Sequence, residues 1–310
     1  MGKGSALQHS FGTRLQYGIF RFLVAWHCVW LARGMIFLII AYYTLLPGAR
    51  KRCQPYLHHR FPGANGWQRL RHTWRLHSRF AQILFDRLCA QVTGSVHIAQ
   101  VKPEHALILA SLAKSTRGCI VVSGHVGAWH VGLAGLEAIN KPISLLQFKT
   151  PGDNGGHFFE GGRGKQYSVI DANDPVGALV SARSVLLRGE ILCCMGDRVT
   201  PNTPPSHTVL LPFLGAPIRV PIMPYILASM TNAQVLLLLT SWEDAAIHIF
   251  SAELFSCDPN LSRKEPLLFE PYARRFVAAM ERFVAYHPYQ FFNFYNMWND
   301  SSYSKLSSLH

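Results

Sequence analysis

Short runs of apolar, often β-branched residues recur along the last two thirds of the chain, and longer amphipathic stretches separate them. The apolar runs predict strands at residues 119–123, 143–148, 191–195, 235–240 and 246–250. The amphipathic stretches predict helices at residues 104–115, 130–139, 175–188, 221–230 and 269–287. Strands that alternate with helices indicate an α/β fold, in which helices flank a mostly parallel or mixed central sheet.

The N-terminal part has a different pattern, because residues 19–46 are almost wholly apolar and rich in aromatic side chains. About 20 such residues are enough to cross a bilayer, but Arg21, His27 and Arg33 interrupt the segment. A charge at the centre of a bilayer is unfavourable unless it reaches the surface or is paired. The pattern predicts a hydrophobic membrane-anchoring helix, and it leaves open whether the helix spans the membrane or lies on it.

Residues 67–92 carry apolar side chains at helical spacing, with arginines between them. This spacing predicts a basic amphipathic helix that lies against a membrane, or else a surface helix that packs on the following domain. The expected organisation is a basic tail at 1–18, a hydrophobic anchor at 19–47, a basic amphipathic helical region at 48–95, a catalytic domain at 96–300 and a tail at 301–310.

The distribution of charge supports a membrane partner. The formal net charge is +13, and the first acidic residue of the chain is Asp86. A basic segment without acids suits an anionic surface, and the apolar residues between the charges favour lipid over nucleic acid. The cluster at residues 50–52 follows the apolar segment. By the positive-inside tendency, this cluster keeps the rest of the chain in the cytoplasm.

The 7 cysteines form no Cys-x-x-Cys pair, and several of them lie in apolar runs. This usage indicates buried free thiols in a reducing compartment.

A histidine stands directly after the first predicted strand of the sheet. That strand ends in Ser123 and Gly124, and His125 follows them. Open α/β sheets place reactive side chains beyond the carboxyl ends of their strands, and glycine lets a substrate approach the backbone. His125 is therefore a candidate catalytic base, and a packed histidine in a strand-to-helix turn is the alternative.

The strand at 191–195 ends in a similar way, because Asp197 and Arg198 follow it. If the sheet brings the two strand ends together, Asp197 could orient His125 and stabilise its charged form. An ion pair with Arg198 or a helix cap is the alternative role for Asp197. Arg198 suits an anionic group, such as the phosphate of a phosphopantetheine or of a lipid headgroup.

The glycine-rich segment 151–166 contains Arg163 and Lys165. Backbone N–H groups beside cations can hold a phosphate, although a solvated loop has the same composition.

Taken in order, these features resemble the bacterial lipid A biosynthesis acyltransferase family, within the lysophospholipid acyltransferase superfamily. That family has a strand, a His-x4-acid motif, a later strand that ends in an acid, a Pro-Phe-Phe-Gly-x-Pro motif, a helix and a further strand. Here residues 212–217 read Pro-Phe-Leu-Gly-Ala-Pro, and residues 287–291 are similar to the family's His-Pro-x-Gln-aromatic ending. The resemblance covers roughly residues 115–300 and implies a sheet of the glycerol-3-phosphate acyltransferase type.

The resemblance implies a membrane-associated acyltransferase at the cytoplasmic face of a bacterial inner membrane. It would move a fatty acyl chain from acyl-ACP or acyl-CoA, as co-substrate, to a hydroxyl or amine of a lipid or glycolipid. No metal or other cofactor is expected. Such a transfer needs a base, donors that face the oxyanion and an apolar groove for the chain. The candidate groove walls are Trp129 and Phe213, and the candidate anion-binding residues are Arg198, Arg163 and Lys165.

The chain departs from the family pattern at one position. His130 stands five residues after His125, where the family has an acid. A second histidine cannot supply the negative charge that stabilises an imidazolium. We therefore expect Asp197 to be the partner of His125, with His130 as a third candidate residue of the same turn.

Two other interpretations remain open. A catalytically silent, lipid-binding homologue would have kept the fold and lost the His-x4-acid pair. A metal hydrolase would use His125, His130 and Asp197, although this spacing is not the i, i+4 histidine pair of a helical zinc site.

Overall fold

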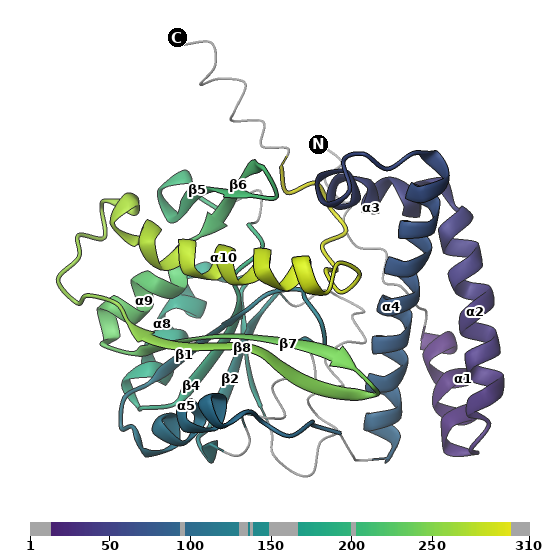
Figure 1. Ribbon diagram of the computed structural model, residues 1–310. Coiled ribbons are helices and arrows are strands. Elements are labelled where there is room, and N and C mark those ends of the chain that lie inside the picture. The colour runs from purple at the N-terminus through teal and green to yellow at the C-terminus, as the bar shows by residue number, and fades with distance from the viewer. Residues whose placement is uncertain are drawn as a thin grey trace, which may run out of the picture.

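The computed structural model describes residues 14–93, 97–129, 136, 139–148, 167–199 and 203–298. A six-stranded sheet forms the centre of the molecule (Figure 1). Its order is β3-β2-β4-β1-β7-β8, and every neighbouring pair is parallel except β7 and β8. The strands are β1 (Cys119–Ser123), β2 (Ile143–Gln147), β3 (Ser168–Asp171), β4 (Ile191–Met195), β7 (Gln234–Glu243) and β8 (Ala246–Ser256). The expected α/β class and mixed sheet are thus confirmed.

The two faces of the sheet bury alternate residues of each strand. In β1, Cys119 and Val121 face a core that includes Leu112 of α5 (Pro103–Lys114). Ile120 and Val122 face a larger core on the other side. Three helices cover that second side (Figure 1), and they are α8 (Pro175–Leu187), α9 (Met223–Thr231) and α10 (Glu270–Tyr286).

An antiparallel hairpin of β5 (Thr208–Phe213) and β6 (Ala216–Pro221) packs against α10 and was not expected. Prolines at positions 212 and 217 make these strands hard to recognise from the sequence, because proline cannot donate to a ladder. The hairpin also delays the start of α9 to Met223, since Pro221 still pairs with Thr208. The short edge strand β3 was missed as well, and most of the helix expected at 130–139 lies outside the described residues.

The hydrophobic segment 19–47 forms two helices in place of the single helix that was expected, and the membrane anchor stays a prediction. α1 (Arg14–Ala25) ends before His27, which takes a left-handed conformation with φ of 56°, and α2 (Val29–Leu45) follows. Among the described residues, no single helix is long and apolar enough to span a membrane. The helices α2 and α3 (Pro47–Arg60) are long and apolar enough only when they are taken together, and the chain bends by 78° between them.

The helices α1 and α2 pack along α4 (Gly66–Thr93), which corresponds to the expected amphipathic helix (Figure 1). A small apolar core of Leu23, Val24, Ala32 and Phe85 joins them. Burial raises the pKa of Asp86 on α4, and the charge of Arg33 on α2 opposes this effect. One of the two arginines that interrupt the apolar segment, Arg33, therefore lies near the first acidic residue of the chain.

The helical region also contacts the end of the α/β part. The Tyr56 hydroxyl on α3 donates to the carbonyl of Pro288 at 2.7 Å, and Arg60 donates to the carbonyl of Val284 at 3.0 Å. These bonds fix α3 against the chain where α10 ends.

A buried histidine joins the three helices α2, α3 and α4. The ring of His77 lies 3.2 Å from Thr44 Oγ1 through Nδ1 and 3.2 Å from Cys53 Sγ through Nε2. Burial lowers the pKa of His77 to about 4 and raises the pKa of the Cys53 thiol to about 12. His77 is therefore held neutral in the folded protein.

This neutral histidine predicts an acid-sensitive helical region. His77 is protonated below about pH 6.5 in the unfolded chain but only near pH 4 in the folded protein. The contribution of neutral His77 to the unfolding free energy is therefore fully present above about pH 6.5, and it is lost as the pH falls towards 4. When the pH is lowered from about 7 to about 4.5, the unfolding free energy of both proteins should fall. We expect the fall to be roughly 2–3 kcal/mol smaller in His77→Gln than in the wild type. Denaturant titrations at the two pH values measure the difference, and equal losses in both proteins would contradict it.

Candidate active site

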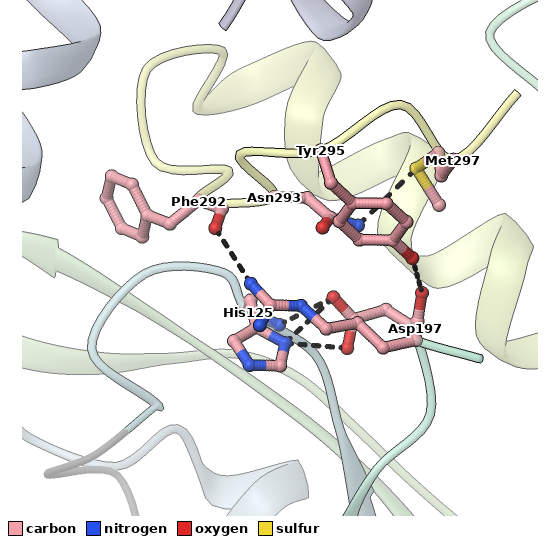
Figure 2. A network of polar contacts seen from close by, with 7 residues as sticks. His125, Asp197, Phe292, Asn293, Tyr295 and Met297 are labelled. Carbon is pink, nitrogen blue, oxygen red and sulfur yellow. Dashed lines mark hydrogen bonds and ion pairs between the residues drawn. The ribbon is translucent and has the colours of Figure 1, made fainter. Parts of the chain in front are cut away.

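The register of two neighbouring strands brings His125 and Asp197 together. β1 and β4 are parallel, and Ser123 pairs with Met195 at their carboxyl ends. His125 and Asp197 each follow two residues later, so both side chains lie at the same edge of the sheet. The two residues are 72 positions apart in the chain, and the expected pairing between them is present (Figure 2).

The imidazole of His125 contacts both oxygens of the carboxylate. Its Nδ1 atom lies 2.9 Å from Asp197 Oδ1 and 3.0 Å from Oδ2, and the main-chain N–H of His125 donates to Oδ2 at 3.1 Å. A carboxylate only accepts hydrogen bonds, so Nδ1 carries the proton and Nε2 is left as an acceptor. The side chain of His125 is 17% exposed, whereas that of Asp197 is 0% exposed.

The carboxylate remains ionised although it is buried. Burial by itself raises the pKa of Asp197, but the charge and hydrogen bonds of His125, together with the charge of Arg198, outweigh it and lower the pKa below the usual value. The site therefore keeps a buried negative charge beside the imidazole of His125.

The turn that carries the histidine depends on a glycine. Gly127 has φ of +53°, and a Cβ atom at this position would lie 1.7 Å from the carbonyl oxygen of Thr240 on β7. The close approach lets the N–H of Ala128 donate to the same carbonyl at 3.3 Å. The turn is thus packed directly on the neighbouring strand.

Aromatic side chains surround the pair. The rings of Trp129 and His125 are 5.6 Å apart, and Phe292 lies at the same distance from Trp129. The Tyr295 hydroxyl donates to the main-chain carbonyl of Asp197 at 3.4 Å (Figure 2). Burial and the nearby carboxylate raise the pKa of Tyr295 to about 12, which keeps this hydroxyl protonated.

The other expected substrate-binding residues have different surroundings. Arg198 is exposed, donates to the carbonyl of Phe292 at 3.2 Å, and lies with its guanidinium 5.7 Å from the centre of the Tyr295 ring. Phe213 is fully buried and stacks on Trp298, so its side chain is part of the core. The remaining candidates lie outside the described residues, and they are His130, Arg163 and Lys165.

Sequence reasoning assigned no site role to the chain after α10, although it noted the His-Pro-x-Gln-aromatic motif there. In the structure, Phe292 and Tyr295 of this segment contact the main chains of His125 and Asp197. The motif was the available signal, but nothing in the local sequence shows which strand ends the segment reaches.

Within the described ranges, no three His, Cys, Asp or Glu side chains lie close enough to hold a metal ion. The metal interpretation required His130, which is not among these residues.

A histidine held by an acid at the carboxyl edge of a mixed sheet defines a candidate acid–base site. Residues 77–300 match the family described as bacterial lipid A biosynthesis acyltransferase. Because the match covers more than half of the 310 residues, the chain belongs to this family and is an acyltransferase. The resemblance inferred from the motif order is thereby confirmed. No curated protein matches the chain.

The packing of the histidine turn predicts a difference between two glycines. Gly127→Ala introduces both a left-handed alanine and a clash with Thr240, whereas Gly215→Ala, at φ of +81° with open space around it, introduces the strain alone. We expect about 1–2 kcal/mol of destabilisation for Gly215→Ala and at least ~3 kcal/mol for Gly127→Ala. Denaturant unfolding of the two variants measures this, and equal losses would show that the clash relaxes without cost.

Proposed function

We propose that this protein transfers a fatty acyl chain from an acyl-ACP or acyl-CoA thioester to a hydroxyl or amine of a membrane lipid or glycolipid, with His125 as general base. The observation that carries the proposal is the contact of His125 Nδ1 with both carboxylate oxygens of Asp197, at 2.9 and 3.0 Å. Family membership supplies the reaction class, and the pair supplies a base in the required tautomer.

The proposed reaction proceeds without a covalent enzyme intermediate. The acceptor oxygen or nitrogen attacks the thioester carbonyl while its proton passes to His125 Nε2. The tetrahedral intermediate then collapses, the carbon–sulfur bond breaks, and the thiolate takes the proton back from Nε2. Asp197 stabilises the imidazolium between these steps, because its buried negative charge lies beside the ring. The transfer requires no metal or other cofactor.

Arg198 is the proposed contact for an anionic group of the substrates. Its guanidinium is exposed and lies beside Tyr295, close to the His125–Asp197 pair. A guanidinium binds phosphate oxygens through paired donors. Arg163 and Lys165 remain proposed phosphate contacts, and Trp129 remains a proposed groove wall because its ring lies near His125.

We also propose that the N-terminal helices attach the protein to the cytoplasmic face of a bacterial inner membrane. On α2, Ala32 and Ile40 face the protein, while Trp30 and Phe37 are exposed, and Trp26 before α2 is exposed as well. Exposed apolar surface beside a basic segment suits a helix that lies in the headgroup region of an anionic bilayer.

The role of His125 as base predicts the loss of transfer in His125→Ala. A positioned general base contributes roughly 100- to 10,000-fold to the rate. Initial rates with acyl-ACP or acyl-CoA and a lipid extract measure the loss, while circular dichroism checks the fold. A folded variant within about threefold of the wild type would remove His125 from the mechanism.

The partner assignment predicts a larger effect for Asp197→Asn than for His130→Ala. Asparagine keeps the size but loses the charge, and it can hold the wrong tautomer, a change that costs about 10,000-fold in the serine-protease triad. His130→Ala removes a polar neighbour only, and His130→Glu, which restores the family's acid, should be tolerated. The same rate measurements decide the matter. An inactive His130→Ala beside an active Asp197→Asn would reverse the assignment. If none of the three changes alters the rate and every rate equals the background without protein, the silent homologue is favoured.

The proposed attachment predicts that apolar contacts and charge act together. The triple variant Trp26→Ser, Trp30→Ser and Phe37→Ser should dissociate from anionic liposomes at high salt. The salt screens the attraction between the basic residues and the lipid headgroups, and the variant lacks the apolar contacts that would otherwise hold it. The wild type should stay bound. The control changes three apolar residues that are also exposed but lie elsewhere, Leu107→Ser, Leu267→Ser and Tyr286→Ser. Liposome flotation measures both, and equal release would contradict attachment through α1 and α2.

A further inference from the structure

The chain beyond α10 pairs with the histidine turn through its main chain. Val126 and Phe291 form an isolated antiparallel bridge. The N–H of Phe292 donates to the carbonyl of His125 at 2.7 Å, and the N–H of Gly127 donates to the carbonyl of Gln290 at 2.8 Å. The turn that carries the candidate base therefore pairs with residues 290–292 from His125 to Gly127. We call residues 290–295 the brace.

The brace also reaches the other member of the pair. Tyr295 donates to the main-chain carbonyl of Asp197 (Figure 2). The carbonyl of Phe292 accepts from Arg198. The peptide of Phe292 thus bonds to the His125 turn through its N–H and to the Asp197 turn through its oxygen. One segment contacts both strand ends that carry the reacting groups.

Gln290 attaches the brace to a third strand. Its Oε1 atom accepts from the N–H of Trp242 at 2.9 Å, and its Nε2 atom donates to the carbonyl of Trp242 at 3.0 Å. Gln290 is only 4% exposed, so these bonds are shielded from water. Trp242 lies two residues after Thr240, whose carbonyl accepts from the other side of the histidine turn. The histidine turn consequently lies between β7 and the brace, and Gln290 bonds the brace to β7.

We propose that Gln290 is a positioning residue for the His125–Asp197 pair, and that it acts by fixing the brace against β7. The inference rests on the proposed function in one respect, that His125 is the base. Contact of Nδ1 with two carboxylate oxygens leaves little freedom for the ring, and a shift of about 1 Å in a catalytic group can lower a rate about 100-fold. A primary amide of this length offers a donor and an acceptor to the same peptide at any pH, whereas a carboxyl group does so only when it is protonated.

The first test compares Gln290→Met with Gln290→Glu over a range of pH. Methionine keeps the length and loses both hydrogen bonds, so kcat should fall by roughly 10- to 100-fold while KM stays within about threefold. An ionised glutamate can only accept, and it faces the Trp242 carbonyl, whereas a protonated glutamate restores both bonds. The rate of Gln290→Glu relative to the wild type should therefore rise as the pH is lowered, while the relative rate of Gln290→Met should not change.

Two further measurements separate positioning from general stability. The imidazole N–H signal of His125, in protein with labelled histidine, should shift or broaden in folded Gln290→Met, because its contact with Asp197 is no longer fixed. Tyr295→Phe should lower kcat in the same way. Its matched control is Tyr289→Phe, which loses a hydroxyl that contacts His72 on α4 at 2.8 Å and should keep kcat within about threefold.

The outcomes distinguish the two proposals. A folded Gln290→Met with wild-type kcat and an unchanged His125 signal overturns the role of Gln290, even where His125→Ala is inactive. A loss of rate that merely follows the folded fraction also overturns it. An active His125→Ala overturns the proposed function itself, whatever Gln290 does. If Gln290→Met does not fold, the pH response of Gln290→Glu and the comparison of Tyr295→Phe with Tyr289→Phe decide the question.

Discussion

The fully buried carboxylate of Asp197 is the constraint on which the site depends. A buried charge is unfavourable unless it is paired and hydrogen-bonded. The ring and the main-chain N–H of His125 supply the hydrogen bonds, and the charge of Arg198 also stabilises the carboxylate. The parallel register of β1 and β4 makes this possible, because it ends the two strands level with each other. A shift of one residue in that register would move the carboxylate away from the imidazole and leave it unpaired.

The chain after α10 connects this pair to the rest of the molecule. Tyr56 of α3 bonds to Pro288, only two residues before Gln290. The segment that contacts both reacting strand ends is therefore the same one that holds the basic N-terminal helices. This shared segment provides a direct structural link between the N-terminal helices and the His125–Asp197 pair.

The N-terminal helices show how the tertiary structure changes the meaning of a charge. Arg33 interrupts an apolar segment, which argued against a simple spanning helix. In the structure it lies on α2 near Asp86 of α4, so its charge is met by the first acid of the chain. The exposed aromatic residues, among them Trp26 and Trp30, then lie on surface that no other part of the described chain covers.

The sequence by itself determined the α/β class, five of the six sheet strands, the long amphipathic helix and the two candidate residues His125 and Asp197. These depend on local periodicity and on residue types at strand ends, which are visible without a fold. It did not determine the hairpin of β5 and β6, the break at His27 or the role of Gln290. Pairing between distant segments decides these features, because a hydrogen bond such as that between Gln290 and Trp242 joins residues 48 positions apart and leaves no local pattern.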